Sequence, residues 1–320
     1  MKRQRGMPMG VLAAAVLSCA LAVPGAWAAG PVSGIVVFGD SLSDSGNAFA
    51  LQRENNTPPN YSVDALLVPD DAYARGGHHF TNGPTWVEDF AKSVGLGPDA
   101  GPAFRDHNSR ATNYAVGGAR ANDDGKNVDL AEQVDAFLHD FGGSAPPGAL
   151  YVIAIGGNDI RDALAAFGAG QDPAPVIAAG VSAIGTNINT LYGAGARRFL
   201  VWNVPNASLV PAVSALGPGA VAVAKSLAQT FNFYLGGQLA SLEALPGISI
   251  TQFDAYAAVT TIYSNPSVFG LTDVTDPCIS PNDPPFVCKN PDTFLFWDGL
   301  HPTSAVHAIV AQAVQQLLGM

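Results

Sequence analysis

The sequence predicts an α/β fold, a three-layer sandwich in which helices cover both faces of a central parallel five-stranded sheet. Short apolar runs, bounded by glycine, proline or polar residues, recur along the chain and have the character of buried strands. Segments with helical spacing of apolar residues separate these runs. Because parallel strands that are buried on both faces need helices to connect and cover them, this alternation predicts the sandwich.

Five runs are expected to form the strands of this sheet. The first is 35–38, an Ile-Val-Val-Phe run that Gly39 ends. The others, in chain order, are 112–116, 150–155, 199–202 and 248–253. Helices are expected over 86–94, 128–141, 174–192, 220–242 and from Pro302 onward. A proline at the first helical position would account for the sharp start of that last helix.

The first 28 residues are expected to be a secretory signal peptide. Three basic residues precede an almost unbroken apolar run over 11–23, and 26–28 has the small-x-small pattern of a cleavage site. The apolar run is too short to span a membrane, and no other stretch is long and apolar enough to do so. Cys19 could accept a lipoprotein anchor, but Leu17 does not fit such a site. We therefore expect a secreted or periplasmic protein in which 29–320 forms one domain.

Charge and cysteine usage agree with export. The net charge is −11, and loss of the leader would remove three basic residues and no acidic one, which gives −14. Such an acidic surface repels phosphate backbones, so nucleic acid is not an expected partner. Cys278 and Cys288 flank a proline-rich loop and are expected to form a disulfide in an oxidising compartment, with two unrelated thiols as the alternative.

Two polar stretches, 53–83 and 264–293, are too long to be simple turns. Loops of this length are commonly walls or lids of active sites. Tyr61, Phe286 and Trp297 either line such a site or pack in the core. The remaining histidines show no metal-ligand spacing, so neither a metal nor another cofactor is expected. These histidines are His78, His79, His107, His139 and His307.

Polar or glycine-rich motifs follow three of the predicted strands. They are Gly-Asp-Ser-Leu-Ser-Asp-Ser-Gly-Asn at 39–47, a glycine pair at 117–118, and Gly-Gly-Asn-Asp at 156–159. A fourth motif, Asp-Gly-Leu-His-Pro-Thr at 298–303, stands just before the last helix. Because ligands of parallel α/β sheets bind beyond the carboxyl ends of the strands, the motifs are expected to build one site.

The residue types in these motifs suit acyl transfer. A serine hydroxyl becomes a nucleophile when a base removes its proton, and an imidazole held by a carboxylate is such a base. Ser41 follows a predicted strand, at an expected helix N-terminus. Asp298 precedes His301 by three residues, so both side chains can face one cavity. Ser41 as a helix cap is the alternative. Three further carboxylates are expected to be caps and turn formers: Asp40, Asp44 and Asp159.

An oxyanion that develops during acyl transfer needs fixed hydrogen-bond donors. The peptide N–H of Ser41, a glycine N–H from 117–118 and an asparagine side-chain amide could supply them. For Asn158, a purely structural place in a turn is the alternative.

The four motifs, in this order, resemble those of the GDSL esterase/lipase family within the SGNH hydrolase superfamily. The resemblance extends from Gly34 to about Gln312 and implies a flavodoxin-like fold and ester hydrolysis without a metal. It implies Ser41 as nucleophile, with His301 and Asp298 as the other members of a catalytic triad. We expect no C-terminal membrane barrel of the kind that autotransporter members have.

The resemblance also implies the donors of the oxyanion hole. The Asn-to-Gly spacing of the second motif, 113–119, assigns this role to Gly118, with Gly117 the less favoured choice. The third motif assigns the side-chain donor to Asn158. Two further stretches, 80–83 and 202–205, match intermediate positions of the family.

The ester itself stays open at this stage. Lipid, phospholipid, choline ester and polysaccharide acetyl ester are all compatible with the motifs, because specificity resides in the loops. Acyl transfer to an alcohol and a lysophospholipase-type activity are alternatives. A protein that only binds a lipid or a glycan is an alternative of another class. The sequence does not determine the oligomeric state or the choice between periplasm and medium.

Overall fold

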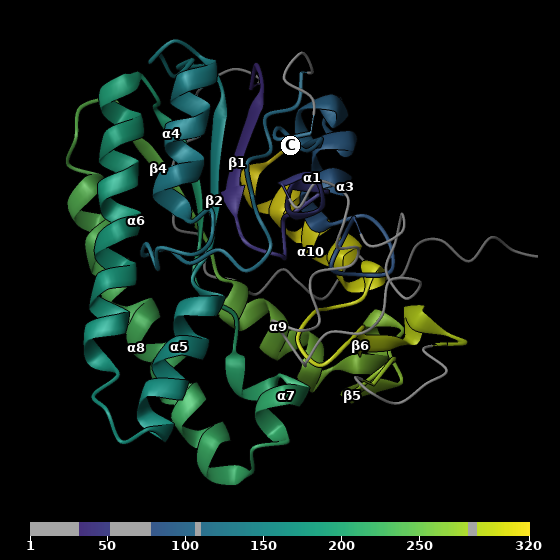
Figure 1. Cartoon of the computed structure of the whole chain (residues 1–320). Coiled ribbons are helices and arrows are strands. Elements are labelled where there is room, and N and C mark those ends of the chain that lie inside the picture. Colours follow the sequence, from purple (N-terminus) through teal and green to yellow (C-terminus); the bar gives the residue numbers. More distant parts are fainter. Residues whose placement is uncertain (1–31, 52–77, 106–109, 281–286) are drawn as a thin grey trace, which may run out of the picture.

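The computed structural model describes residues 32–51, 78–105, 110–280 and 287–320. Four parallel strands form the central sheet in the order β1 (Ile35–Gly39), β2 (Leu150–Ala154), β3 (Arg198–Trp202) and β4 (Ser249–Phe253), as Figure 1 shows in part. The expected signal peptide with Cys19, and also Tyr61, His107 and Phe286, lie outside the described residues. The predicted α/β class with a parallel sheet is confirmed.

The prediction of a fifth regular strand at 112–116 is wrong for the described residues. This segment does run along the outer edge of β1, where Tyr114 N–H donates to Val37 O at 2.7 Å and Val116 N–H donates to Gly39 O at 3.1 Å. However, the side chain of Asn113 binds the backbone: its Oδ1 accepts the Ala115 N–H at 3.0 Å. The local side-chain bond prevents a regular ladder. With this segment counted, the order is that of flavodoxin-like sheets.

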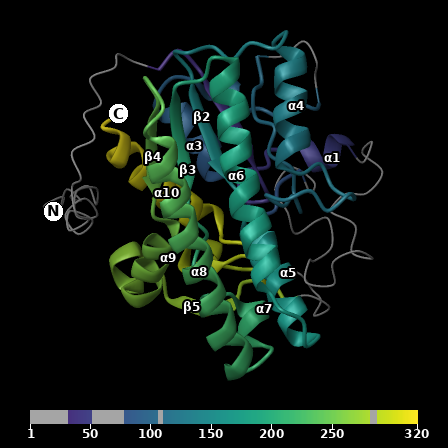
Figure 2. The same cartoon turned by 90° about the vertical axis from the view of Figure 1, so that its left-hand side faces the viewer.

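Helices cover the sheet on both faces. Figure 1 shows α4 (Leu130–Asp140), α6 (Ala174–Ala194) and α8 (Pro218–Leu242) on one side of the strands, and Figure 2 shows α6 and α8 in front of them. The other face packs against α3 (Trp86–Ser93) and α10 (Ser304–Leu318). Each of these five helices buries an apolar stripe in one of two large hydrophobic clusters, which lie on opposite faces of the sheet.

These five helices confirm the five predicted ones, with one correction at a helix start. Pro302 is not the first residue of α10, because Thr303 is the extended N-cap and Ser304 begins the helix. Pro302 instead forms an isolated bridge with Phe296. The remaining helices are short or lie near the carboxyl edge of the sheet: α1 (Asn47–Leu51), α5 (Gly157–Gly168), α7 (Pro211–Ser214) and α9 (Ala255–Ser264). None of the described helices is long and apolar enough to cross a membrane.

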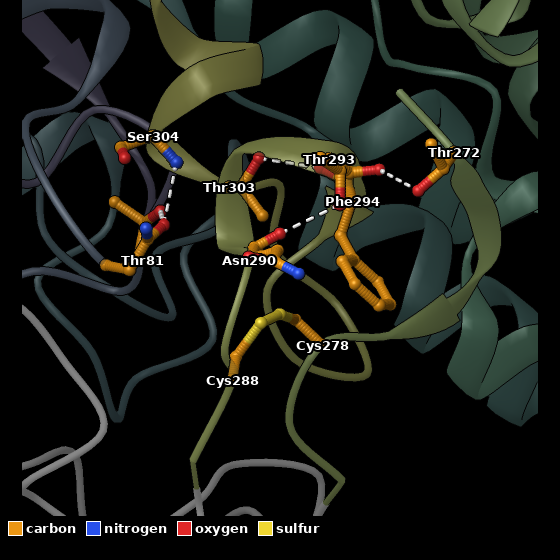
Figure 3. Close-up of a disulfide and its surroundings, with 10 residues drawn as sticks. Thr81, Thr272, Cys278, Cys288, Asn290, Thr293, Phe294, Thr303 and Ser304 are labelled. Carbon is orange, nitrogen blue, oxygen red and sulfur yellow. Dashed lines mark hydrogen bonds between the residues drawn. A yellow bond between two sulfur atoms is a disulfide. The ribbon is translucent and has the colours of Figure 1, made fainter. Parts of the chain in front are cut away.

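The polar stretch 264–293 is only partly a loop. It contains β5 (Asp273–Pro277), which pairs with β6 (Phe294–Phe296) in a small second sheet. A disulfide joins Cys278 to Cys288 directly after β5, with the Cα atoms 5.5 Å apart (Figure 3). The stretch also contains two short 3-10 turns, Pro266–Phe269 and Pro291–Thr293. Two further 3-10 turns lie elsewhere, at Gly97–Ala100 and Ala207–Leu209. The other polar stretch, 53–83, is described only from residue 78.

Candidate active site

Ser41 lies in a tight turn at the carboxyl end of β1. The N–H groups of Ser43 and Asp44 donate to Asp40 O at 3.0 and 3.1 Å, and Leu42 N–H donates to Asp40 Oδ1 at 3.0 Å. The expectation that Ser41 begins a helix is therefore wrong. The chain makes a single turn here, which Asp40 closes with its carbonyl and its carboxylate, and α1 begins only at Asn47.

Asp298 and His301 lie in one turn before α10. Asp298 Oδ1 accepts the N–H groups of Leu300 and His301, both at 2.7 Å, which closes the turn. The ring of His301 then faces the same carboxylate, with Nδ1 2.9 Å from Oδ2 and 3.1 Å from Oδ1. The spacing of three residues thus brings the two side chains together, as predicted from Asp-x-x-His.

The other ring nitrogen of His301 faces the serine. Nε2 is 2.9 Å from Ser41 Oγ, so the structure brings Ser41, His301 and Asp298 into one hydrogen-bonded row. Asp298 is fully buried and His301 is 6% exposed. Such a row can move a proton from the hydroxyl to the imidazole.

The charges of the row favour that proton transfer. Burial by itself would raise the pKa of Asp298, but the charge of His301 and the hydrogen bonds from His301 and Leu300 outweigh it and lower the pKa. An ionised Asp298 accepts a hydrogen bond from Nδ1–H, which leaves the lone pair of Nε2 for Ser41. Burial has the opposite outcome at Asp40: it raises the pKa of Asp40 to about 6, although Leu42 and His301 oppose the shift.

The glycine pair lies in a loop that Asp44 holds beside the turn of Ser41. Asp44 Oδ2 accepts the Gly117 N–H at 2.7 Å, and the same carboxylate accepts three N–H groups at the start of α1. Asp44 is therefore the cap that the sequence predicts. Gly118 follows with a φ of 84°, a left-handed conformation that glycine adopts without strain.

Asn158 lies in the first turn of α5 and binds the same loop. Its Nδ2 donates to Ala119 O at 2.9 Å, and Asp159 accepts the N–H groups of Ala121 and Asn122 at 2.9 and 3.3 Å. The predicted structural role of Asp159 is thus confirmed. Gly118 and Asn158 come together through this loop.

A cavity of about 460 Å³ begins at Ser41, Asn158 and His301. Its lining is mainly apolar and comes from α5, α7, α9, α10 and β6. Examples are Leu164, Val213, Val259, Leu295 and Val306. Sequence reasoning missed this cavity, because each lining residue reads locally as an ordinary core position. Trp297 packs instead with Phe80 and Ile279 in a separate core cluster.

One group of described carboxylates could hold a metal ion. Asp123, Asp129 and Glu132 place one oxygen each within 4.8 Å of one another. Asp129, however, already accepts the N–H groups of Arg120 and Asp124 at 2.7 and 2.8 Å. These bonds give the buried carboxylate a structural role in the loop after the glycine pair.

Known proteins resemble this chain over most of its length. A family model described as GDSL-like Lipase/Acylhydrolase matches residues 35–314. The chain is 27% identical over 303 residues to the "Thermolabile hemolysin" of Vibrio parahaemolyticus, an alignment that covers 88% of this chain and 62% of that protein. It is 27% identical over 333 residues to GDSL esterase/lipase At2g04570 of Arabidopsis thaliana, which covers 89% and 91%.

A solved structure, an extracellular lipase from Streptomyces rimosus, aligns with 88% of this chain and 98% of its own, at 17% identity and a TM-score of 0.39. The chain thus spans less than two thirds of the hemolysin and most of the plant protein.

Proposed function

The chain belongs to the GDSL-like lipase and acylhydrolase family, a family of esterase- and lipase-type acyl hydrolases, and we propose that it hydrolyses carboxylic esters through an acyl-enzyme on Ser41. In this proposal His301 is the general base and Asp298 orients it. The observation that carries the proposal is the pair of 2.9 Å contacts, from Ser41 Oγ to Nε2 and from Nδ1 to Asp298 Oδ2.

The chemistry takes two steps. Ser41 Oγ attacks the ester carbonyl carbon while Nε2 of His301 takes the hydroxyl proton, and the tetrahedral intermediate expels the alcohol, which receives that proton. Water then attacks the acyl-enzyme, gives its proton to Nε2, and the carboxylic acid leaves as Ser41 regains its hydrogen. Ionised Asp298 stabilises the imidazolium in both steps.

Three donors are proposed for the oxyanion: the N–H groups of Ser41 and Gly118, and the amide of Asn158. The Gly117 N–H is bound to Asp44, which supports Gly118 as the glycine donor. The Asn158 amide has two hydrogens, and Ala119 O accepts one of them. The second hydrogen can serve the oxyanion, while the first fixes the side chain in place.

The cavity favours esters of medium- or long-chain acids over acetyl esters. It adjoins Ser41 and is lined mainly by aliphatic side chains of α7, α9 and α10. An acyl chain in it would leave water, and each buried methylene contributes about 0.8 kcal/mol. We therefore propose a lipid-type acyl ester as the substrate class.

The test measures the hydrolysis of p-nitrophenyl esters of increasing acyl length by the wild-type protein and by Ser41→Ala. We expect the variant to lose on the order of a thousandfold or more in kcat. Equal activity in both proteins would show that another group is the nucleophile. Hydrolysis by neither protein would instead favour a lipid- or glycan-binding protein, and ester products formed with added glycerol would indicate acyl transfer.

We also propose export. The support is the basic and apolar pattern of residues 1–28 and the disulfide between Cys278 and Cys288, a bond typical of oxidising compartments. N-terminal sequencing of the protein recovered from culture medium and from periplasm tests this. Protein found only in the cytoplasm, with residue 1 retained, would contradict it.

A further inference from the structure

The segment 80–83, Phe-Thr-Asn-Gly, lies against the turn that contains His301. Thr81 Oγ1 donates to Pro302 O at 2.8 Å, and Ser304 N–H donates to Asn82 Oδ1 at 2.8 Å. Figure 3 shows Thr81 beside Ser304 at the start of α10. The two bonds thus hold the backbone immediately after His301, from a segment more than 200 residues away in the sequence.

The opposite side of this turn is held by β6. Trp297 N–H donates to His301 O at 2.7 Å, and Thr303 N–H donates to Leu295 O at 3.1 Å. The turn is therefore fixed between β6 and the segment 80–83. Because Thr303 makes no side-chain cap bond, Asn82 supplies the cap at the start of α10.

Phe80 contacts both parts of the candidate site. Its ring centroid lies 5.4 Å from that of His301, and a Cβ placed on Gly117 would overlap the same ring. The side chain is only 6% exposed. The ring of Phe80 thus lies between His301 and Gly117, and neither residue can move toward the other without displacing that ring.

The close approach of the segment to α10 depends on Gly83. A Cβ there would lie 2.6 Å from Ser304 Cβ and 2.8 Å from Ser304 Oγ. A larger residue would push the segment away from the turn. The hydrogen bond from the Ser304 N–H to Asn82 Oδ1 would then lengthen.

We infer that Phe80, Thr81 and Asn82 are positioning residues that set the place of His301 relative to Ser41 and the glycine loop. The inference rests on the proposed function. None of these three residues lines the cavity, so they act on the 2.9 Å contact between Nε2 and Ser41 Oγ and not on substrate binding. Small displacements of catalytic groups reduce rates strongly.

The experiment removes one hydroxyl. Thr81→Val keeps the β-branched shape but loses the bond to Pro302 O, and we expect kcat to fall about tenfold with KM within about twofold of wild type. Thr81→Ser retains the hydroxyl and should restore most of kcat. Thr190→Val is the matched control, because Thr190 Oγ1 donates to a carbonyl, Thr186 O at 3.1 Å, in the distant helix α6.

Each protein is also labelled with a fluorophosphonate, which reports the reactivity of Ser41 without turnover, and its urea midpoint is measured. The inference would be overturned if Thr81→Val kept the kcat and the labelling rate of the wild type. It would also be overturned if Thr190→Val or Thr81→Ser lost as much kcat as Thr81→Val. A wild-type protein that cleaves no ester would refute the proposed function, and the labelling rates would still decide this inference. If Thr81→Val does not fold, Asn82→Ala takes its place in the same measurements.

Discussion

Substitution of Ala258 by leucine should shorten the acyl chain that the protein accepts. Ala258 lies on α9 and lines the cavity beside Val259 and Ile262. Leucine adds three carbon atoms, which would occupy the space of about three substrate methylenes. At about 0.8 kcal/mol for each buried methylene, a long-chain ester loses up to about 2.4 kcal/mol, or roughly sixtyfold in kcat/KM. We expect an acetyl ester, which has only one carbon beyond the carbonyl, to keep its rate.

The assay measures kcat/KM for p-nitrophenyl acetate, butyrate, octanoate and dodecanoate. In the wild-type protein kcat/KM should rise by up to about fourfold for each methylene until the cavity is filled. Ala257→Leu is the matched control, because Ala257 is the adjacent residue of α9, is exposed and does not line the cavity. A flat chain-length profile in the wild type, or the same profile in both variants, would refute the reasoning that the cavity holds the acyl chain.

Three further perturbations test other parts of the structure. Asp298→Asn should lower kcat by about 10⁴ without a comparable change in KM, and stopped-flow ester hydrolysis measures it; a loss below tenfold would remove Asp298 from the triad. Asp40 has a pKa of about 6 against 3.8 for an ordinary aspartate. The folded state therefore keeps a proton that the unfolded state loses between these values, and the free energy of unfolding should fall by on the order of 3 kcal/mol as pH rises through that window. Urea unfolding of Asp40→Asn at pH 4 and pH 7 should show a smaller fall than wild type, and an equal fall would contradict the assignment. Replacing Cys278 and Cys288 by serine opens a loop with a sequence separation of 10 and should lower the free energy of unfolding by about 3 kcal/mol; an unchanged urea midpoint in the double variant would show that the bond does not stabilise the fold.

Three of the four regular strands, β1, β2 and β3, could be predicted from apolar runs that are buried along their whole length, whereas the edge strand β4 is only partly buried. Predicted 199–202 and observed Arg198–Trp202, for instance, differ by one residue. The segment 112–116 is also expected to be a strand, but the side chain of Asn113 binds Ser43 O at 2.7 Å and the Ala115 N–H at 3.0 Å. Side-chain bonds to the backbone, whether local like that to Ala115 or long-range like that to Ser43, leave no periodic signal in the sequence.

The candidate triad was predictable for a different reason. Asp298 and His301 are close in the chain, and the motif order fixes Ser41 at the end of the first strand. The sequence did not indicate the turn at Ser41, which Asp40 closes in place of a helix. The cavity was also beyond prediction, because residues far apart in the sequence, such as Val213 of α7 and Val259 of α9, come to line it only in the folded chain.

The contact between Ser41 Oγ and His301 Nε2 joins two residues that are 260 positions apart. A nascent chain that has not yet produced the turn after β6 contains the serine but neither its base nor the carboxylate that holds that base. Acyl hydrolysis would therefore begin only after synthesis has passed His301 and α10 has packed against α3. On the proposed function, activity would report complete folding of the domain, and a chain kept unfolded until export could not hydrolyse the lipids of the cell that makes it.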